Sequence, residues 1–259
     1  MASSKELKII SPFQKLIIKF FDLFGYELKR KHNFNDRWGS FIAELNDDRK
    51  KQIKRFQEIT LASELNLWSI YQSIKYINDE NIDGDIVECG VYNGNTMAFI
   101  GEIHDELKLN KKIWGYDTFD GFVKNSFTDN DIDIKTGKKV NYVSSDIFYS
   151  LDEVKQNIIL NNKKNFEKYV FIEGDILETL NNKDNIPDKI SFLRLDTDIY
   201  KTTKKQLEIL YDKLVPGGVL HIDDYGLCPG VKTAVDNFFS NKNIWLHRVD
   251  MTCRYLVKK

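Results

Sequence analysis

The sequence predicts an α/β fold built around a mostly parallel sheet. Five strand-length runs, rich in β-branched or aromatic residues, alternate with helical stretches after residue 84. Each run ends at, or continues into, an acidic residue or a glycine; the runs are 85–90, 112–117, 169–175, 190–196 and 218–224. This alternation is typical of βαβ units, whose strands lie parallel. Two further runs in 244–259 are expected to close the sheet as an antiparallel pair.

The composition indicates a folded chain of 259 residues, with 42% hydrophobic and 30% charged residues. That length suffices for one large domain, alone or with an appendage. The 38 basic residues nearly balance the 39 acidic ones, which gives no electrostatic case for binding nucleic acid. The three cysteines are far apart, so we expect neither a disulfide framework nor a thiolate zinc site.

The N-terminal part, residues 1–56, differs from the rest of the chain. Its apolar stretch at 13–23 has helical spacing and is followed by basic residues at 29–32. This pattern favours a helix that packs on the main domain or on a second subunit, and the alternative is a helix at a membrane surface. Charged residues interrupt the stretch and no segment is long enough to span a bilayer, so a cytoplasmic protein is expected.

Residues 57–259 are predicted to form the main domain. It begins with a helix over 62–79, whose apolar residues lie on one side. The polar segment 123–150 is the longest irregular insertion, and a lid is its expected use.

The candidate site lies where the strands end, because ligands of open α/β sheets bind beyond the carboxyl ends of the strands. The first strand runs into "VECGVYNGNT", which places Glu88, Gly90 and Gly94 before a helix. Glycines let the backbone approach a ligand, and the start of a helix offers free N–H groups to an anion. The G-x-x-x-G spacing differs from the G-x-G-x-x-G of dinucleotide binders and is common in strand-to-helix turns.

Acidic residues follow the other strands. Asp117 ends the second strand, where a carboxylate can accept hydrogen bonds from both ribose hydroxyls or can simply be a solvated turn residue. Asp175 follows the third strand, where an adenine amino group could be recognised. Asp198 follows the fourth strand and is expected to be the N-cap of a helix.

Three carboxylates are expected to converge in this cleft, those of Asp196, Asp223 and Asp224. They follow the fourth and fifth strands, which are neighbours in the usual order of such sheets. Their mutual repulsion would be unfavourable if they had only a structural role. A hard divalent cation such as Mg²⁺, which prefers oxygen ligands, would compensate for it. The alternative is that they belong to turns and helix caps.

These motifs together resemble the macrocin O-methyltransferase family. The resemblance covers about residues 57–240 and is carried by "DIVECGVYNGNTMAF", "GYDTFDGF", "EGDILETL", "FLRLDTDIYKTTKKQLEILYDKLVPGGVLHIDDYG" and "PGVKTAVDNFF". It implies a Rossmann-like class I methyltransferase fold, with a seven-stranded sheet whose last strand is antiparallel. It also implies a sugar O-methyltransferase that depends on S-adenosylmethionine and Mg²⁺.

The resemblance further implies roles for individual residues. Asp196, Asp223 and Asp224 would bind the metal, which would chelate two neighbouring sugar hydroxyls, and Asp196 would be the catalytic base. The cofactor would be bound by a larger set, comprising Glu88, Gly90, Val91, Tyr92, Thr96, Asp117, Thr118, Asp175 and Ile176.

Other functions remain open from the sequence alone. A nicotinamide-dependent oxidoreductase would also use a glycine turn and a ribose-binding acid, and a non-catalytic binding protein could keep the fold. The acceptor implied is a small-molecule or nucleotide-linked sugar of a natural product or surface glycan, or a non-sugar substituent of a glycan. The many Lys, Asn and Ile residues favour the surface glycan. A homo-oligomer and an N-terminus close to a membrane are the expected associations.

Overall fold

The computed structural model describes residues 20, 23–24, 42–132, 136–139, 148–162 and 166–259. The chain divides into two compact units, residues 1–43 and 44–259, and the second contains the helices and strands named below. The predicted N-terminal helix and its association with a subunit or membrane fall almost entirely outside the described residues. No helix among the described residues is long and apolar enough to cross a membrane.

The predicted sheet is confirmed, with seven strands in the order β3-β2-β1-β4-β5-β7-β6. Strands β1 to β5 run parallel, whereas β7 is antiparallel to both β5 and β6. The strands are β1 (Asp85–Cys89), β2 (Ile113–Asp117), β3 (Tyr169–Glu173), β4 (Ile190–Leu195), β5 (Leu214–Ile222), β6 (His247–Arg248) and β7 (Arg254–Val257). The fifth strand begins four residues before its predicted start at residue 218.

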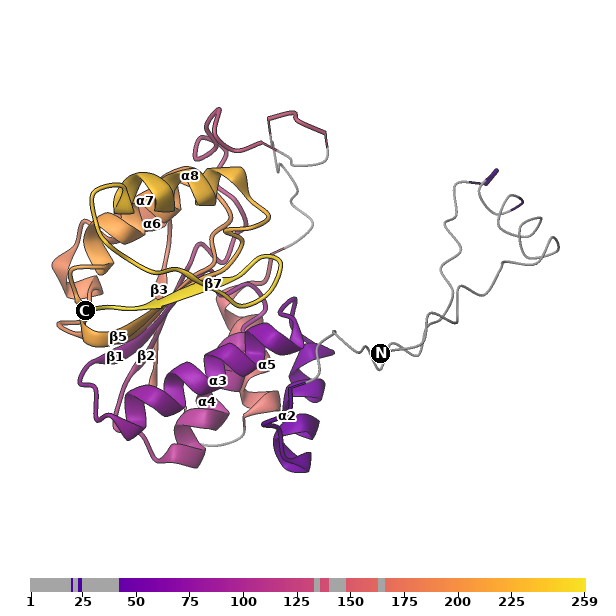
Figure 1. Ribbon diagram of the computed structural model, residues 1–259, viewed down its shortest axis with the longest axis vertical. Coiled ribbons are helices and arrows are strands. Elements are labelled where there is room, and N and C mark those ends of the chain that lie inside the picture. The colour runs from indigo at the N-terminus through magenta and orange to yellow at the C-terminus, as the bar shows by residue number, and fades with distance from the viewer. Residues whose placement is uncertain (1–19, 21–22, 25–41, 133–135, 140–147, 163–165) are drawn as a thin grey trace, which may run out of the picture. The chain divides into compact units, whose positions relative to one another are not determined.

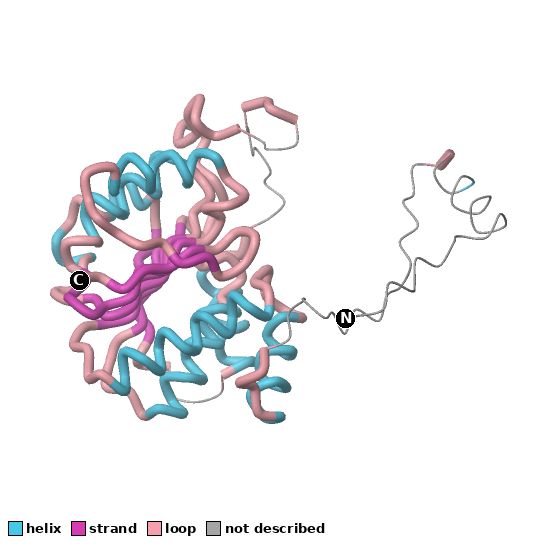
Figure 2. Tube along the Cα trace, in the orientation of Figure 1, coloured by secondary structure: helices cyan, strands magenta, loops and turns pink. Residues whose placement is uncertain are grey.

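Helices cover both faces of the sheet (Figures 1 and 2). One face carries α2 (Asp47–Gln57), α3 (Glu64–Asp79), α4 (Asn95–Leu107) and α5 (Leu151–Asn161). The other carries α6 (Ile176–Thr179), the short 3₁₀-helix η1 (Lys183–Asn185), α7 (Tyr200–Leu210) and α8 (Pro229–Phe239). Successive strand residues point to opposite faces. Ile86 therefore joins the core under the first helices, whereas Val87 joins the core under α7 and α8.

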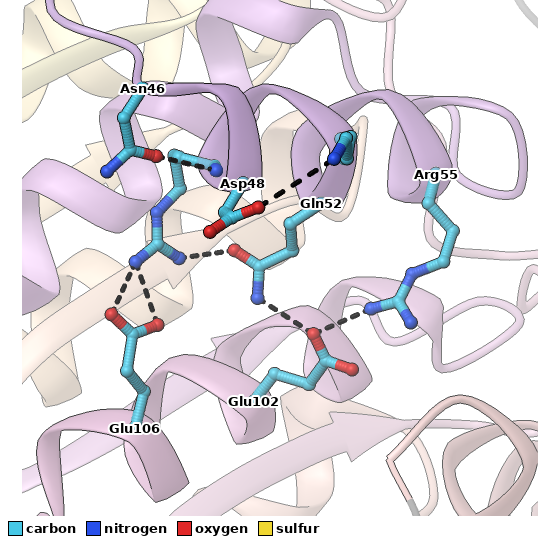
Figure 3. Close-up of a pocket in the computed structure, with 8 residues that line it drawn as sticks. Asn46, Asp48, Gln52, Arg55, Glu102 and Glu106 are labelled. Carbon is cyan, nitrogen blue, oxygen red and sulfur yellow. Dashed lines mark hydrogen bonds and ion pairs between the residues drawn. The ribbon is translucent and has the colours of Figure 1, made fainter.

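The second compact unit begins at Glu44 and includes α2, which precedes the predicted start of the main domain at residue 57. Ile53 and Phe56 on α2 are fully buried, and the Phe56 ring lies 5.1 Å from that of Phe99 on α4. Ion pairs border this contact, among them Arg55 with Glu102 at 2.6 Å (Figure 3). The charged residues of α2 outnumber its two buried apolar ones. For this reason the face of the helix that packs on the domain could not be recognised in the sequence.

The predicted insertion, 123–150, is described in part. Ile132 and Lys139 form an isolated antiparallel bridge, and residues 140–147 fall outside the described part of the chain. The function of the insertion as a lid stays a prediction.

A pair of matched substitutions tests whether α2 belongs to the folded domain. Ile53→Ala removes a buried side chain and should lower the free energy of unfolding by about 2–5 kcal/mol. Ile159→Ala deletes the same atoms from α5, where the side chain is 50% exposed, and should change it by less than about 0.5 kcal/mol. Urea denaturation followed by circular dichroism measures both, and equal effects would show that α2 does not pack on the domain.

Candidate active site

A cavity of about 740 Å³ lies at the carboxyl ends of the central strands. Its walls come from the segments that follow β1 to β5, from the start of α3, and from residues 250–252 between β6 and β7. Among the described residues, all but one of the predicted site residues line this cavity: Gly90, Val91, Tyr92, Thr96, Asp117, Thr118, Asp175, Ile176, Asp196, Asp223 and Asp224. The exception is Glu88.

The turn after β1 lies directly against the end of β4. Gly90 has a φ of +90°, and its N–H donates to the Tyr116 carbonyl at 2.8 Å. A Cβ at this position would lie 1.8 Å from the Asp196 carbonyl oxygen. Only glycine fits here, both because of its backbone angle and because of this close approach.

Asp117 holds the same turn through its carboxylate. One oxygen accepts from the backbone N–H groups of Val91 and Tyr92, at 2.7 and 3.1 Å, and the other accepts from that of Phe119 at 2.9 Å. A carboxylate has about four acceptor positions. Asp117 therefore shapes the turn and retains about one acceptor position for a ligand.

Asp175 lines the cavity and also caps α6. Its Oδ1 accepts from the Leu177 N–H at 2.9 Å. Ile176, which follows it, is 5% exposed and contributes an apolar wall.

The expected convergence of Asp196, Asp223 and Asp224 is confirmed. Their strands are neighbours, and the Asp223 N–H donates to the Leu195 carbonyl at 2.9 Å. Each of the three carboxylates offers an oxygen that lies within 4.8 Å of those of the other two. An oxygen donor set of this kind suits Mg²⁺.

The prediction that Asp198 caps a helix is wrong. Helix α7 begins at Tyr200, whose N–H donates to Asp131 of the insertion at 2.7 Å. Asp198 instead has a φ of +61° and shares a side-chain hydrogen bond with Asp224. It forms a second acidic group with Asp224 and Cys228, again within 4.8 Å.

Sequence reasoning missed Arg194. Its guanidinium is 2% exposed and pairs with three carboxylates: Nη1 with Glu88 at 2.8 Å and with Asp196 at 2.5 Å, and Nη2 with Asp223 at 2.5 Å. Glu88 is fully buried by this contact. An arginine inside the apolar run "SFLRLD" was the available signal, since a buried cation requires anionic partners.

Asp223 is also held from the neighbouring elements. Asn66, near the start of α3, donates from Nδ2 to its Oδ1 at 3.1 Å, and the Thr252 hydroxyl donates to the same oxygen at 3.2 Å. Neither residue was predicted from the sequence, because no local sequence pattern marks a polar side chain that donates to a carboxylate far away in the chain.

Burial raises the pKa values of three carboxyl groups at this site, those of Asp224, Asp196 and Glu88. It raises the pKa of Asp224 to about 9, with Asp198 contributing, and raises that of Asp196 well above its usual range. Burial also raises the pKa of Glu88 to about 8, although the Arg194 charge opposes the shift. A divalent cation beside these groups would favour their ionised forms.

Other candidate groups prove structural. His221 is buried beside Cys253, and burial together with the Arg194 charge lowers its pKa to about 3, which keeps it neutral. The Tyr225 hydroxyl donates to Asp236 at 2.7 Å and, unlike Tyr92, does not line the described part of the cavity.

A second cavity, of about 550 Å³, lies between α2 and α4 (Figure 3). Its charged groups largely satisfy one another. Arg49 pairs with Glu106 at 2.5 Å, and both Gln52 and Arg55 donate to Glu102. This arrangement attaches α2 to the domain and leaves the first cavity as the candidate active site.

A family model described as macrocin-O-methyltransferase (TylF) matches residues 43–258. The demethyldecarbamoylnovobiocin O-methyltransferase of Streptomyces niveus is 28% identical over 219 residues, which are 80% of this chain and 77% of that protein. The 8-demethyl-8-(2,3-dimethoxy-alpha-L-rhamnosyl)-tetracenomycin-C 4'-O-methyltransferase of Streptomyces olivaceus is 25% identical over 177 residues, 65% of this chain and 63% of that protein.

Among solved structures, that of the O-methyltransferase NovP superposes with a TM-score of 0.67 and 27% sequence identity. The match covers 77% of this chain and 82% of that one. The predicted class I methyltransferase fold is therefore confirmed.

Two glycines with left-handed backbone angles test the close packing of the turn. Gly90→Ala should lower the free energy of unfolding by about 2–5 kcal/mol, because backbone strain and a collision with the Asp196 carbonyl add together. Gly137 has a φ of +65° with nothing within 4 Å, so Gly137→Ala should cost only the strain, about 1–2 kcal/mol. Urea denaturation compares the two variants, and a Gly90 variant as stable as the Gly137 variant would contradict the packing.

Proposed function

The chain belongs to the macrocin-O-methyltransferase family and is an S-adenosylmethionine-dependent O-methyltransferase, and on this premise we propose that it methylates a sugar hydroxyl with the help of Mg²⁺. The observation that carries the proposal is the meeting of Asp196, Asp223 and Asp224 in the cavity beside the Gly90 turn. Family membership removes the nicotinamide-dependent oxidoreductase from consideration.

The first part of the cavity fits the cofactor. Helix α4 begins after Gly94, which has no side chain to cap it, so backbone N–H groups remain for the methionyl carboxylate. Gly90, Val91, Tyr92 and Thr96 would hold this end of the cofactor. The predicted contacts farther along are Asp117 and Thr118 with the ribose, and Asp175 and Ile176 with the adenine.

The second part of the cavity fits a divalent metal ion. The three aspartates provide only oxygen donors, which Mg²⁺ prefers, and three protein ligands leave about three coordination positions for water or substrate. When bound, Mg²⁺ would supply the Lewis acidity that lowers the pKa of a substrate hydroxyl. Glu88 does not share this surface, because its side chain lies behind it against Arg194.

Asp196 is the proposed base. Its side chain is 26% exposed, compared with 11% for that of Asp223, so it can reach a substrate hydroxyl more readily. Arg194 binds its Oδ2 and stabilises the ionised form that can accept a proton. The hydroxyl oxygen must also lie in line with the sulfonium methyl group, at about 3 Å, so the rigid strand ends contribute through positioning.

The acceptor that we propose is a sugar of a natural product or of a surface glycan, either free of a carrier or linked to a nucleotide. The name of the Streptomyces olivaceus relative, which includes a rhamnosyl group, supports a sugar. The many Lys, Asn and Ile residues of this chain favour a surface-glycan sugar as the acceptor.

Substitution of the proposed base separates catalysis from cofactor binding. Asp196→Asn should lower kcat at least about 100-fold, because the amide cannot accept the proton, while the affinity for S-adenosylmethionine measured by calorimetry stays within about 3-fold. Asp212→Asn, an exposed position after α7, is the matched control and should leave both unchanged. An Asp196 variant with undiminished turnover would remove this residue from the mechanism.

Removal of the metal tests the proposed cofactor requirement. Transfer of labelled methyl groups to a panel of nucleotide-sugars and glycans should stop with excess EDTA and return with excess Mg²⁺, because the substrate hydroxyl is too weak an acid without a Lewis acid. Full turnover in EDTA would contradict the metal site. Failure with every hydroxylated acceptor would contradict the sugar assignment.

A further inference from the structure

We propose that Glu88 and Arg194 are positioning residues for methyl transfer: Glu88 directs the Arg194 guanidinium, which holds Asp196 and Asp223 at the spacing that a divalent cation requires. This inference rests on the metal site proposed above. It assigns a role to two buried charged residues that are neither metal ligands nor cofactor contacts in the function proposed above.

The network joins three adjacent strands through one side chain. Glu88 of β1 and Arg194 of β4 are directly opposed in the sheet, and Asp223 follows the end of β5. Nη1 of Arg194 pairs with both Glu88 and Asp196, while Nη2 pairs with Asp223. The guanidinium therefore contacts two of the three proposed metal ligands at once.

Burial makes these contacts hard to replace. Glu88 is 0% exposed, and Arg194, although it lines the cavity, is only 2% exposed, so water offers the two side chains few other partners. Glu88 Oε2 and Arg194 Nε are buried and have no hydrogen-bond partner within the described part of the chain. A buried ion pair with unmet hydrogen bonds is a poor source of stability, and apolar side chains often serve as well. The presence of this ion pair is better explained if Asp196 and Asp223 must be held in a fixed arrangement.

Glu88 matters because a guanidinium is a planar fork with fixed N–H directions. One Nη1 proton points to Glu88, which directs the other to Asp196 and leaves Nη2 for Asp223. Without the Glu88 charge, the fork is free to turn and form a bidentate pair with one aspartate. The separation of the two aspartate carboxylates would then change, although neither of them was altered.

A purely electrostatic effect of Glu88 and Arg194 on cation affinity can be distinguished from a positioning effect. If the two residues act only through space, removing the negative Glu88 should weaken cation binding and removing the positive Arg194 should strengthen it. If they act by positioning, both substitutions should weaken binding. The sign of the effect of Arg194→Met thus distinguishes the two explanations.

The experiment is a titration of the protein with Mn²⁺ alone, followed by electron paramagnetic resonance, without cofactor or acceptor. Glu88→Gln, Arg194→Met and Arg194→Lys should each weaken Mn²⁺ binding about 10–100-fold, the effect expected when a group that orients a metal ligand is lost. The lysine keeps the charge but lacks the fork, so it also decides the outcome if the methionine variant does not fold.

Matched controls come from the ion pair of Arg55 and Glu102, shown in Figure 3 between α2 and α4. Glu102→Gln and Arg55→Met repeat the same chemical changes outside the active-site cavity and should leave the Mn²⁺ affinity unchanged. Calorimetry should show that Glu88→Gln binds S-adenosylmethionine within about 3-fold of the unaltered protein, since Glu88 does not line the described part of the cavity.

Three results would overturn the inference while leaving the proposed function intact. These are unchanged Mn²⁺ affinity in Glu88→Gln and Arg194→Lys, tighter binding by Arg194→Met, and loss of cofactor affinity by Glu88→Gln with normal Mn²⁺ binding. A different result, no Mn²⁺ binding by the unaltered protein, would refute the proposed metal site and this inference with it.

Discussion

The active site depends on one buried cation, the guanidinium of Arg194. Acidic residues lie at or just beyond the carboxyl ends of β1, β4 and β5. In a low-dielectric interior they would otherwise repel one another or take up protons. Arg194 pairs with Glu88, Asp196 and Asp223 and so lets three carboxylates approach within the reach of one side chain. It cannot neutralise them all, and the charge that remains is what a divalent ion would balance.

The proposed cofactor and metal parts of the cavity are joined by the backbone. Gly90 lies against the Asp196 carbonyl, and Asp117 fastens the following turn through two of its N–H groups. The Asp196 N–H in turn donates to the Cys89 carbonyl at 2.8 Å. A methyl group and its acceptor oxygen must be aligned for transfer, and these direct backbone contacts would set the relative position of the two proposed parts.

The sequence allowed the sheet to be predicted, because strand periodicity is a local pattern. It also allowed most of the cavity to be predicted, because ligands of open α/β sheets bind beyond the carboxyl ends of the strands. Asp196 and Asp223 could be brought together in this way without knowledge of their contacts. The apolar run around Arg194 signalled a buried cation, but it did not identify all of its partners, because Glu88 and Asp223 come from two other strands. Asn66 could not be predicted, since Asp223 lies 157 residues away and no local pattern connects the two. Asp198 was misjudged for a related reason: the cap of α7 comes from Asp131, a residue 69 positions earlier.

That distant cap also connects the insertion, 123–150, with the segment that follows the proposed base, Asp196. Asp131 is 3% exposed, its Oδ1 accepts from the Tyr200 N–H, and its Oδ2 accepts from the Thr128 N–H at 2.7 Å. A Cβ on Gly230 would lie 2.0 Å from Asp131 Oδ1, so the glycine leaves room for this carboxylate between α7 and α8. The first part of the insertion is thus fastened two residues from Asp198. Asp196 and Asp223 are held separately from this anchor, because Arg194 and the strand ends fix their positions.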